Sequence, residues 1–185
     1  MIQERLKELR AQMQERGIDI YIVPTSDFHQ SEYVGEYFKA RKYMTGFTGS
    51  AGTAVITKEE AGLWTDGRYF IQAEKQLEGS TVKLFKMGEE GVPKVEEYVK
   101  DHLTEGSCIG FDGRVMDAKS GEKYAKMAEE KKAALYVKED LVGNIWKDRP
   151  QLPANKVWIL EDAYAGRSMA DKIADVRTKM QKEGA

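Results

Sequence analysis

The sequence predicts an α/β fold, with a mixed β-sheet flanked by helices. Short runs rich in β-branched and aromatic residues alternate along the chain with amphipathic segments of helical period. One pair of β-rich runs, residues 53–57 and 61–65, is separated by only three polar residues, as in a β-hairpin. Crossover helices join parallel strands and a hairpin joins antiparallel ones, so the sheet should contain both kinds of pairing.

The first elements follow from local patterns. Leu6, Leu9 and Met13 recur at spacings of three and four residues, which predicts an amphipathic helix over 3–16 that ends at Gly17. The next elements are expected to be a buried strand over 18–25, a short helix from Ser31 through Phe38, the hairpin, a helix over 67–77 and a strand over 82–85.

The later elements continue the alternation. Val95 and Val99 share one helical face, which predicts a helix over 92–103. A strand over 108–111, a charged helix over 117–132 and a last short strand over 134–137 should follow.

The predicted domain organisation rests on two prolines and a repeat. Pro150 and Pro153 favour a stiff linker, so we expect a first domain over 1–145, a linker over 146–163 and a truncated second domain over 164–185. Segments 6–17 and 173–184 share a pattern that either arises by chance between amphipathic helices or marks a duplicated domain. The aligned pairs are Leu6 and Ile173, Leu9 and Val176, Arg10 and Arg177, Met13 and Met180, and Gly17 and Gly184.

Composition excludes several classes of protein. The 29 Lys and Arg residues nearly balance the 31 Asp and Glu residues, so no basic surface for nucleic acid is predicted. Cys108 is the single cysteine, which excludes an intrachain disulfide and fits a reducing compartment. No apolar run reaches the length of about 18 residues that a membrane helix needs, and the charged N-terminus does not resemble a signal peptide. We therefore expect a cytoplasmic location without membrane contact.

The Gly-rich stretch over 45–53 precedes a predicted strand. It lacks the Gly-Lys-Ser/Thr of a phosphate-binding loop, and it leads into a strand rather than the helix of a dinucleotide-binding turn. Ser50 has Thr48 where a nucleophile elbow needs glycine. The stretch is either a tight turn of small residues or a loop whose backbone approaches a ligand.

Asp66 and Arg68 lie where a strand gives way to a helix. Asp66 should cap the helix, whereas a cation at Arg68 opposes the helix dipole and so suggests another role, such as ligand contact at the strand end. The same Asp-Gly-Arg triplet recurs over 112–114, which favours the alternative that it is only the turn chemistry of this fold.

Other candidate site residues are less distinctive. Arg41 and Lys42 could hold a carboxylate or could lie solvated at the surface. His29 follows a predicted strand, where a histidine more often makes hydrogen bonds than acts in catalysis. With two distant histidines and one cysteine, the sequence predicts no metal site and no catalytic group of its own.

Several motifs together resemble the N-terminal domain of Xaa-Pro aminopeptidases, the aminopeptidase P branch of the creatinase/prolidase-type metallopeptidases, in their long three-domain form. They are HQSEY over 29–33, TGFTGSAGT over 45–53, WTDGRYF over 64–70, LVGNIWKDRP over 141–150 and YAGRS over 164–168. The resemblance spans almost the whole chain and agrees with a duplicated domain, because the first two domains of that form share a fold.

The resemblance implies an N-terminal fragment of a hydrolase. The parent protein is expected to remove an N-terminal residue that precedes proline, using two divalent metals, commonly manganese, held in a third domain that is absent from this chain. The fragment is expected to be inactive, to belong to a homodimer and to close one side of the cleft that binds proline-containing peptides.

The resemblance also implies residue roles. Arg68 matches a substrate-binding position, and Arg41, Phe47 and His29 are further substrate-binding candidates. Ala40-Arg41 departs from the Asp-aromatic pattern of the two-domain form, so roles from that form are not transferred. The alternatives are a stand-alone peptide-binding module, the N-terminal domain of a prolidase or creatinase and, more remotely, a serine hydrolase that uses Ser50.

Overall fold

The computed structural model describes residues 1–184, in which the chain forms two compact units, Met1–Gln151 and Leu152–Ala185. The strands of the first unit are β1 (Ile20–Pro24), β2 (Thr53–Thr57), β3 (Ala61–Thr65), β4 (Lys83–Lys86), β5 (Cys108–Phe111) and β6 (Ala134–Tyr136). Its helices are α1 (Ile2–Glu15), η1 (Glu36–Phe38), α2 (Ala40–Thr45), η2 (Gly67–Tyr69), α3 (Phe70–Leu77), α4 (Val95–His102), α5 (Ala118–Glu130) and α6 (Leu141–Ile145).

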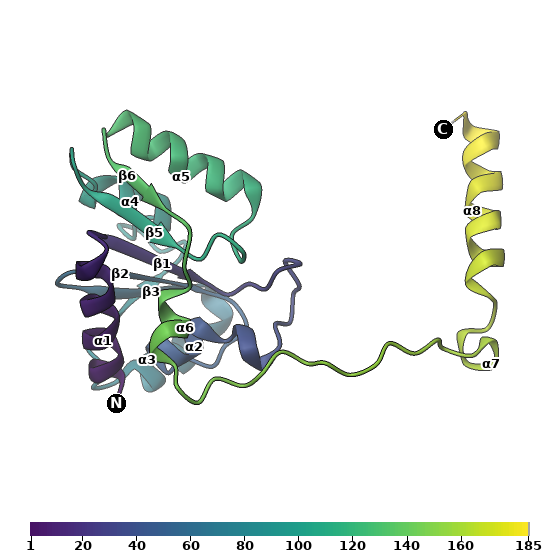
Figure 1. The fold of residues 1–185 in the computed structure, drawn as a ribbon, viewed down its shortest axis with the longest axis horizontal. Helices are drawn as coiled ribbons and strands as arrows, with labels where there is room; N and C mark the ends of the chain where they lie inside the picture. Colours follow the sequence, from purple (N-terminus) through teal and green to yellow (C-terminus); the bar gives the residue numbers. More distant parts are fainter. Residues whose placement is uncertain (185) are drawn as a thin grey trace. The chain divides into compact units, whose positions relative to one another are not determined.

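The six strands form one mixed sheet in the order β4-β3-β2-β1-β5-β6 (Figure 1). Only β2 runs against its neighbours, pairing antiparallel with β1 and with β3, while the other neighbouring pairs are parallel. The predicted fold class is confirmed, including the hairpin, whose strands have the expected bounds.

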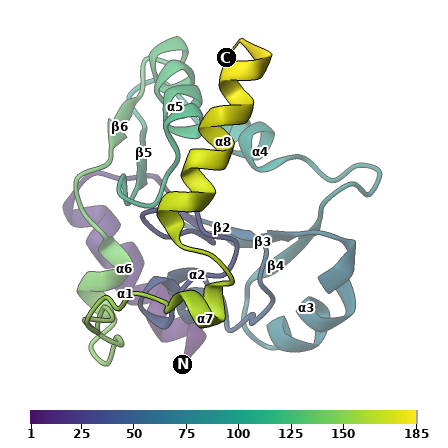
Figure 2. The same cartoon turned by 90° about the vertical axis from the view of Figure 1, so that its right-hand side faces the viewer.

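Both faces of the sheet are buried. Along β1, Tyr21 and Val23 point to one apolar cluster and Ile20 and Ile22 to the other, as the two-residue period of a strand requires. Helices α1, α2, α3 and α6 cover the first face, and α4 and α5 cover the second (Figures 1 and 2). A strand enclosed on both faces explains the continuous apolar run of β1.

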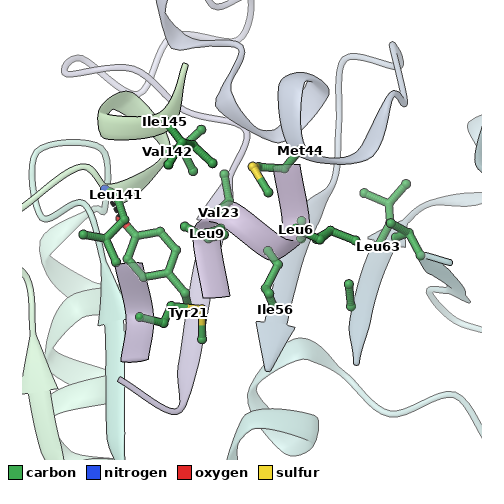
Figure 3. Packing of buried hydrophobic residues seen from close by; sticks show 14 of the residues in the cluster. Leu6, Leu9, Tyr21, Val23, Met44, Ile56, Leu63, Leu141, Val142 and Ile145 are labelled. Carbon is green, nitrogen blue, oxygen red and sulfur yellow. Dashed lines mark hydrogen bonds between the residues drawn. The ribbon is translucent and has the colours of Figure 1, made fainter. Parts of the chain in front are cut away.

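Helix α1 packs its predicted apolar face onto this sheet. Figure 3 shows Leu6 and Leu9 among strand side chains that include Val23 and Ile56. Next to this face, the Arg10 Nε donates a hydrogen bond of 2.9 Å to the Thr57 carbonyl oxygen. The spacing of apolar residues therefore identified the buried face of α1 correctly.

Two local predictions need correction. The helix expected from Ser31 is wrong, because Asp27 Oδ1 accepts the backbone N–H of both His29 and Ser31 in a turn, and only the short η1 forms after Gly35. Helices α2 and α6 were not predicted, since five or six residues are too few to show a helical period.

The first compact unit continues beyond α6. Trp146 stacks on Tyr43 with ring centroids 4.6 Å apart, and Arg149 Nε donates to the Tyr37 carbonyl oxygen at 2.8 Å. These contacts tie the segment after α6 to the domain as far as Gln151. The domain limits at residues 145 and 164 stay predictions.

In the second unit, residues 152–161 form neither helix nor strand, and α7 (Asp162–Ala165) and α8 (Met169–Glu183) follow. Ser168 caps α8 by accepting the Asp171 backbone N–H at 3.1 Å. Gly184 ends α8 with a φ of 71°, close to the 65° of Gly17 after α1, so both copies of the sequence pattern end on a left-handed glycine.

Candidate functional site

The sheet topology brings the predicted site segments to one edge of the first unit. Five strands run parallel, so their carboxyl ends meet at the same edge, with His29 after β1 and Arg68 after β3. The Gly-rich loop leads into β2, which runs the opposite way, and so enters the sheet at this edge too. Crevices beyond the carboxyl ends of strands are the usual ligand sites of α/β sheets.

Arg41 is buried beneath the Gly-rich loop, with 4% of its surface exposed. Its Nε donates to Thr25 Oγ1 at 2.9 Å, its Nη1 donates to the Phe47 carbonyl oxygen at 2.8 Å, and its Nη2 donates to that of Gly49. Burial lowers the pKa of Arg41 to about 10, so the guanidinium remains charged at neutral pH. The solvated alternative is wrong for Arg41, because this cation is buried and binds main-chain carbonyls, and it fits Lys42, which is exposed. Binding of a ligand carboxylate stays a prediction.

Phe47 supports the same loop from below. Its ring is fully buried, and the Arg41 guanidinium lies over it at 4.7 Å from the ring centroid. A Cβ on Gly49 would lie 2.2 Å from the Phe47 ring, so the chain can fold over this ring only with glycine at that position. These contacts support the tight-turn interpretation of the loop, while the approach of its backbone to a ligand stays a prediction.

Two hydroxyl groups pair beside the loop. Ser50 Oγ lies 2.7 Å from the Tyr69 phenolic oxygen, and this hydrogen bond lowers the pKa of Tyr69. The Tyr69 ring packs edge-to-face on Phe47, with centroids 5.8 Å apart. Ser50 therefore links the loop to η2, and no histidine or carboxylate among residues 1–184 accepts a hydrogen bond from its hydroxyl.

Arg68 lies next to this pair, with 69% of its side chain exposed. Its Nε and Nη2 donate to Asp66 Oδ1 and Oδ2 at 2.8 and 2.9 Å, and Asp66 Oδ1 also accepts the Arg68 backbone N–H, as predicted for a cap. The hydrogen bond to Asp66 and its charge, with a smaller contribution from Glu32, raise the pKa of Arg68. Asp66 thus holds the guanidinium by its Nε and Nη2 atoms, while most of the Arg68 side chain faces solvent.

A cleft of about 190 Å³ opens between the loop and the segment around η1. The charged side chains in its lining are Arg41, Lys39, Lys42 and Glu32. Because three of them are cations and one is an anion, the lining carries a net positive charge. Its remaining lining residues are Thr25, Tyr33, Val34, Phe38, Thr48, Gly49 and Ser50. Arg68 is not among these lining residues; its guanidinium lies 5.3 Å from the ring of Tyr69, whose hydroxyl pairs with the lining residue Ser50. A positively charged cleft of this kind suits a ligand rich in hydrogen-bond acceptors, such as a peptide main chain.

The four predicted site residues occupy three kinds of position. Arg68 presents an accessible cation, whereas Arg41 and Phe47 lie beneath the loop, where they shape the cleft. His29 is exposed in the turn after β1 and is not among the residues that line the cleft. Substrate contact by each of the four stays a prediction.

Sequence reasoning missed the remaining polar residues of the site. Lys39 and Glu32 line the cleft, and Tyr69 carries the hydroxyl that binds Ser50. The density of aromatic residues over 32–42 was a usable signal, because aromatic side chains are enriched where a surface binds a partner. The pairing of Ser50 with Tyr69 gave no signal, since it depends on how two loops meet.

Two other features are absent from the part of the chain that the structure describes. No group of three or more His, Cys, Asp or Glu side chains in residues 1–184 is placed to hold a metal ion. None of the helices in this range is long and apolar enough to span a membrane.

Comparison with known proteins assigns the family. The model of the creatinase/prolidase N-terminal domain matches residues 5–139, and a second model with the same description matches residues 148–185. A solved X-prolyl aminopeptidase from Caenorhabditis elegans, described as a cytosolic enzyme with a di-nuclear active site, covers 100% of this chain with a TM-score of 0.85 and 32% identity. This chain covers 32% of that protein.

Curated relatives give the same assignment. Aminopeptidase P2 of Arabidopsis thaliana is 41% identical over 189 residues, which covers 100% of this chain and 26% of the relative. A probable Xaa-Pro aminopeptidase P of Pyrenophora teres is 46% identical over 184 residues, covering 97% and 27% respectively. The chain thus spans about a quarter of the length of these relatives. It belongs to the creatinase/prolidase N-terminal domain family and corresponds to the N-terminal part of proteins named Xaa-Pro aminopeptidase P.

Proposed function

We propose that this chain is the non-catalytic N-terminal part of a metal-dependent Xaa-Pro aminopeptidase, which removes an N-terminal residue before proline. In this proposal the domain supports dimerisation and closes one side of the cleft that binds proline-containing peptides. The observation that carries the proposal is the similarity over nearly the whole chain, including the segment after residue 148, to relatives with that activity in their names.

The catalytic metals of the proposed enzyme, two divalent ions such as manganese, would belong to the remainder of the protein. The residues described here do not fit such a group, because none of them form a cluster of three or more metal-binding side chains. The role of this chain is therefore to bind and position the peptide. A second domain of the same fold, beginning near residue 164, and a cytoplasmic location are parts of the same proposal, supported by the second model match and by the free, buried Cys108.

Arg68 is the residue that we propose to contact the peptide. It is an accessible cation beside the Ser50–Tyr69 pair, and a guanidinium suits a main-chain carbonyl or a carboxylate. Arg41 and Phe47 would act indirectly by holding the loop, and His29 is a candidate for contact from the neighbouring turn.

The test uses the complete protein that contains this chain. Arg68→Ala should lower kcat/KM for Xaa-Pro peptides roughly 10- to 100-fold, because one charge-assisted hydrogen bond to the substrate is lost. Arg114→Ala, a change in the second Asp-Gly-Arg turn, serves as the matched control and should leave kcat/KM within about twofold.

Two outcomes would contradict the proposal. An unchanged kcat/KM in Arg68→Ala would show that Arg68 does not contact the substrate. Failure of the complete protein to cleave Xaa-Pro peptides would show that it is not an Xaa-Pro aminopeptidase. Tight binding of proline-containing peptides by the chain alone would instead favour a stand-alone binding module.

A further inference from the structure

The two Asp-Gly-Arg turns adopt the same local geometry. In the first, Asp66 Oδ1 accepts from the Arg68 backbone N–H at 3.1 Å and from Nε at 2.8 Å, while Oδ2 accepts from Nη2 at 2.9 Å. In the second, Asp112 makes the same three hydrogen bonds with Arg114, each of 3.0 Å. The triplet is therefore a self-contained clamp that grips one side of a guanidinium with a carboxylate two residues earlier.

The two clamps differ in their surroundings. Arg114 has a second carboxylate, Asp140 Oδ2, 3.7 Å from its Nη2, and the ring of Phe28 lies 5.4 Å away. Asp112 is almost buried, with 10% of its side chain exposed, while the Arg114 side chain is 55% exposed. In the first clamp the aspartate is more open, with Asp66 and Arg68 exposed at 36% and 69%, and Asp66 is the only hydrogen-bond acceptor of Arg68 within residues 1–184.

The hydrogen bonds to Asp66 leave one edge of the Arg68 guanidinium free. A guanidinium has five N–H groups, and Asp66 takes the one on Nε and one on Nη2. Both N–H groups of Nη1 and the second of Nη2 remain, and one from each nitrogen lie side by side on the outer edge of the planar group. Asp66 therefore fixes the orientation of this edge, and its negative charge neutralises the positive charge of the guanidinium.

We infer that Asp66 is a positioning and specificity-determining residue, which forms a neutral ion pair with Arg68 so that the guanidinium donates to the main-chain carbonyl of a peptide in preference to a terminal carboxylate. This inference rests on the proposed function, because it assumes that Arg68 faces the substrate. Asp66 caps η2 in the fold, and by this inference it would also determine which peptide group binds to Arg68.

Electrostatics gives the direction of this preference. A carboxylate bound to the outer edge would be attracted by the guanidinium but repelled by Asp66, a few ångströms farther away, so much of the attraction would cancel. A carbonyl oxygen carries no net charge and keeps the hydrogen bonds without that repulsion. Removing the Asp66 charge should therefore favour acidic ligands specifically.

The experiment measures kcat/KM of the complete protein on pairs of Xaa-Pro peptides that differ only in ending as an acid or as an amide, over lengths of two to five residues. Asp66→Asn keeps the cap, because its side-chain oxygen still accepts the Arg68 backbone N–H and the Nε–H, but it removes the charge and replaces Oδ2, the acceptor of Nη2, with an NH2 group. We expect the acid-to-amide ratio to rise about tenfold in this variant at the length that places the terminus at Arg68. Asp112→Asn is the matched control and should leave the ratio within about twofold at every length.

The outcomes separate this inference from the proposed function. If Arg68→Ala lowers kcat/KM but Asp66→Asn changes acid and amide peptides equally at every length, the inference is overturned and the proposed function stands. If Arg68→Ala has no effect, the proposed substrate contact of Arg68 fails and this inference fails with it, whereas a complete protein without Xaa-Pro cleavage would overturn the proposed enzyme. The double variant Asp66→Asn/Arg68→Ala adds a check that does not depend on substrate length. The rise in the acid-to-amide ratio should disappear in this variant. A rise that persists would overturn the proposed role of Asp66.

Discussion

Helices α1 and α8 carry the same apolar pattern in different surroundings. In α1, Leu9 and Met13 are at most 1% exposed, whereas the matching Val176 and Met180 in α8 are 56% and 46% exposed. The sequence pattern therefore encodes a helix with an apolar face, and a separate set of residues decides whether that face is covered. In α1 the covering residues come from strands and helices far along the chain.

The two helices consequently depend on different forces. Met1, at the start of α1, makes no side-chain cap, and the helix is held by burial against the sheet. α8 has a side-chain cap from Ser168, and its apolar face adds no burial within the described residues. Substitutions at matching positions should therefore have unequal effects.

The largest difference is expected for the central apolar pair. Leu9→Ala should lower the free energy of unfolding by about 3 kcal/mol, because it leaves a cavity in a fully buried site. Val176→Ala should change it by less than about 0.5 kcal/mol, as at an exposed position. Denaturant unfolding of the whole chain, followed by tryptophan fluorescence, measures both values. Equal losses in the two variants would show that α8 is as well packed as α1.

An intermediate difference is expected for the paired arginines. Arg10→Met keeps the aliphatic stem but removes the hydrogen bond from Nε to the Thr57 carbonyl oxygen, so it should cost about 1.5 kcal/mol. Arg177→Met in α8 should cost less than about 0.5 kcal/mol. The same denaturant unfolding measures both, and a loss at Arg177 as large as that at Arg10 would contradict the comparison.

Much of the fold could be predicted from local patterns, and the exceptions have two physical causes. The hairpin of β2 and β3 and the buried face of α1 follow from periods of two and of three to four residues. The helix expected at Ser31 does not form, because the Asp27 side chain accepts hydrogen bonds from the backbone there. Helix α6 could not be predicted, because its five residues are too few to show a helical period.

The candidate site was predictable in its outline and not in its interior. Arg68 could be placed at a strand end from the Asp-Gly-Arg triplet, and Asp66 could be identified as a cap. The burial of Arg41 could not be predicted, because a cation normally stays solvated and its acceptors belong to a loop whose path depends on packing over Phe47. Local chemistry thus predicts exposed site residues better than the buried ones that hold them.

The smallest effect concerns the cap that distinguishes α8 from α1. Ser168→Ala removes the acceptor of the Asp171 backbone N–H, which should destabilise α8 by about 1 kcal/mol and raise the local opening constant roughly fivefold. Hydrogen exchange of the amides over 169–176 should accelerate accordingly, while those of α1 stay unchanged. Ser168→Asp, which restores an acceptor, should return exchange to the starting rate. If the alanine variant keeps its full protection, the helix cannot be depending on its cap, and its apolar face must already be packed as the face of α1 is.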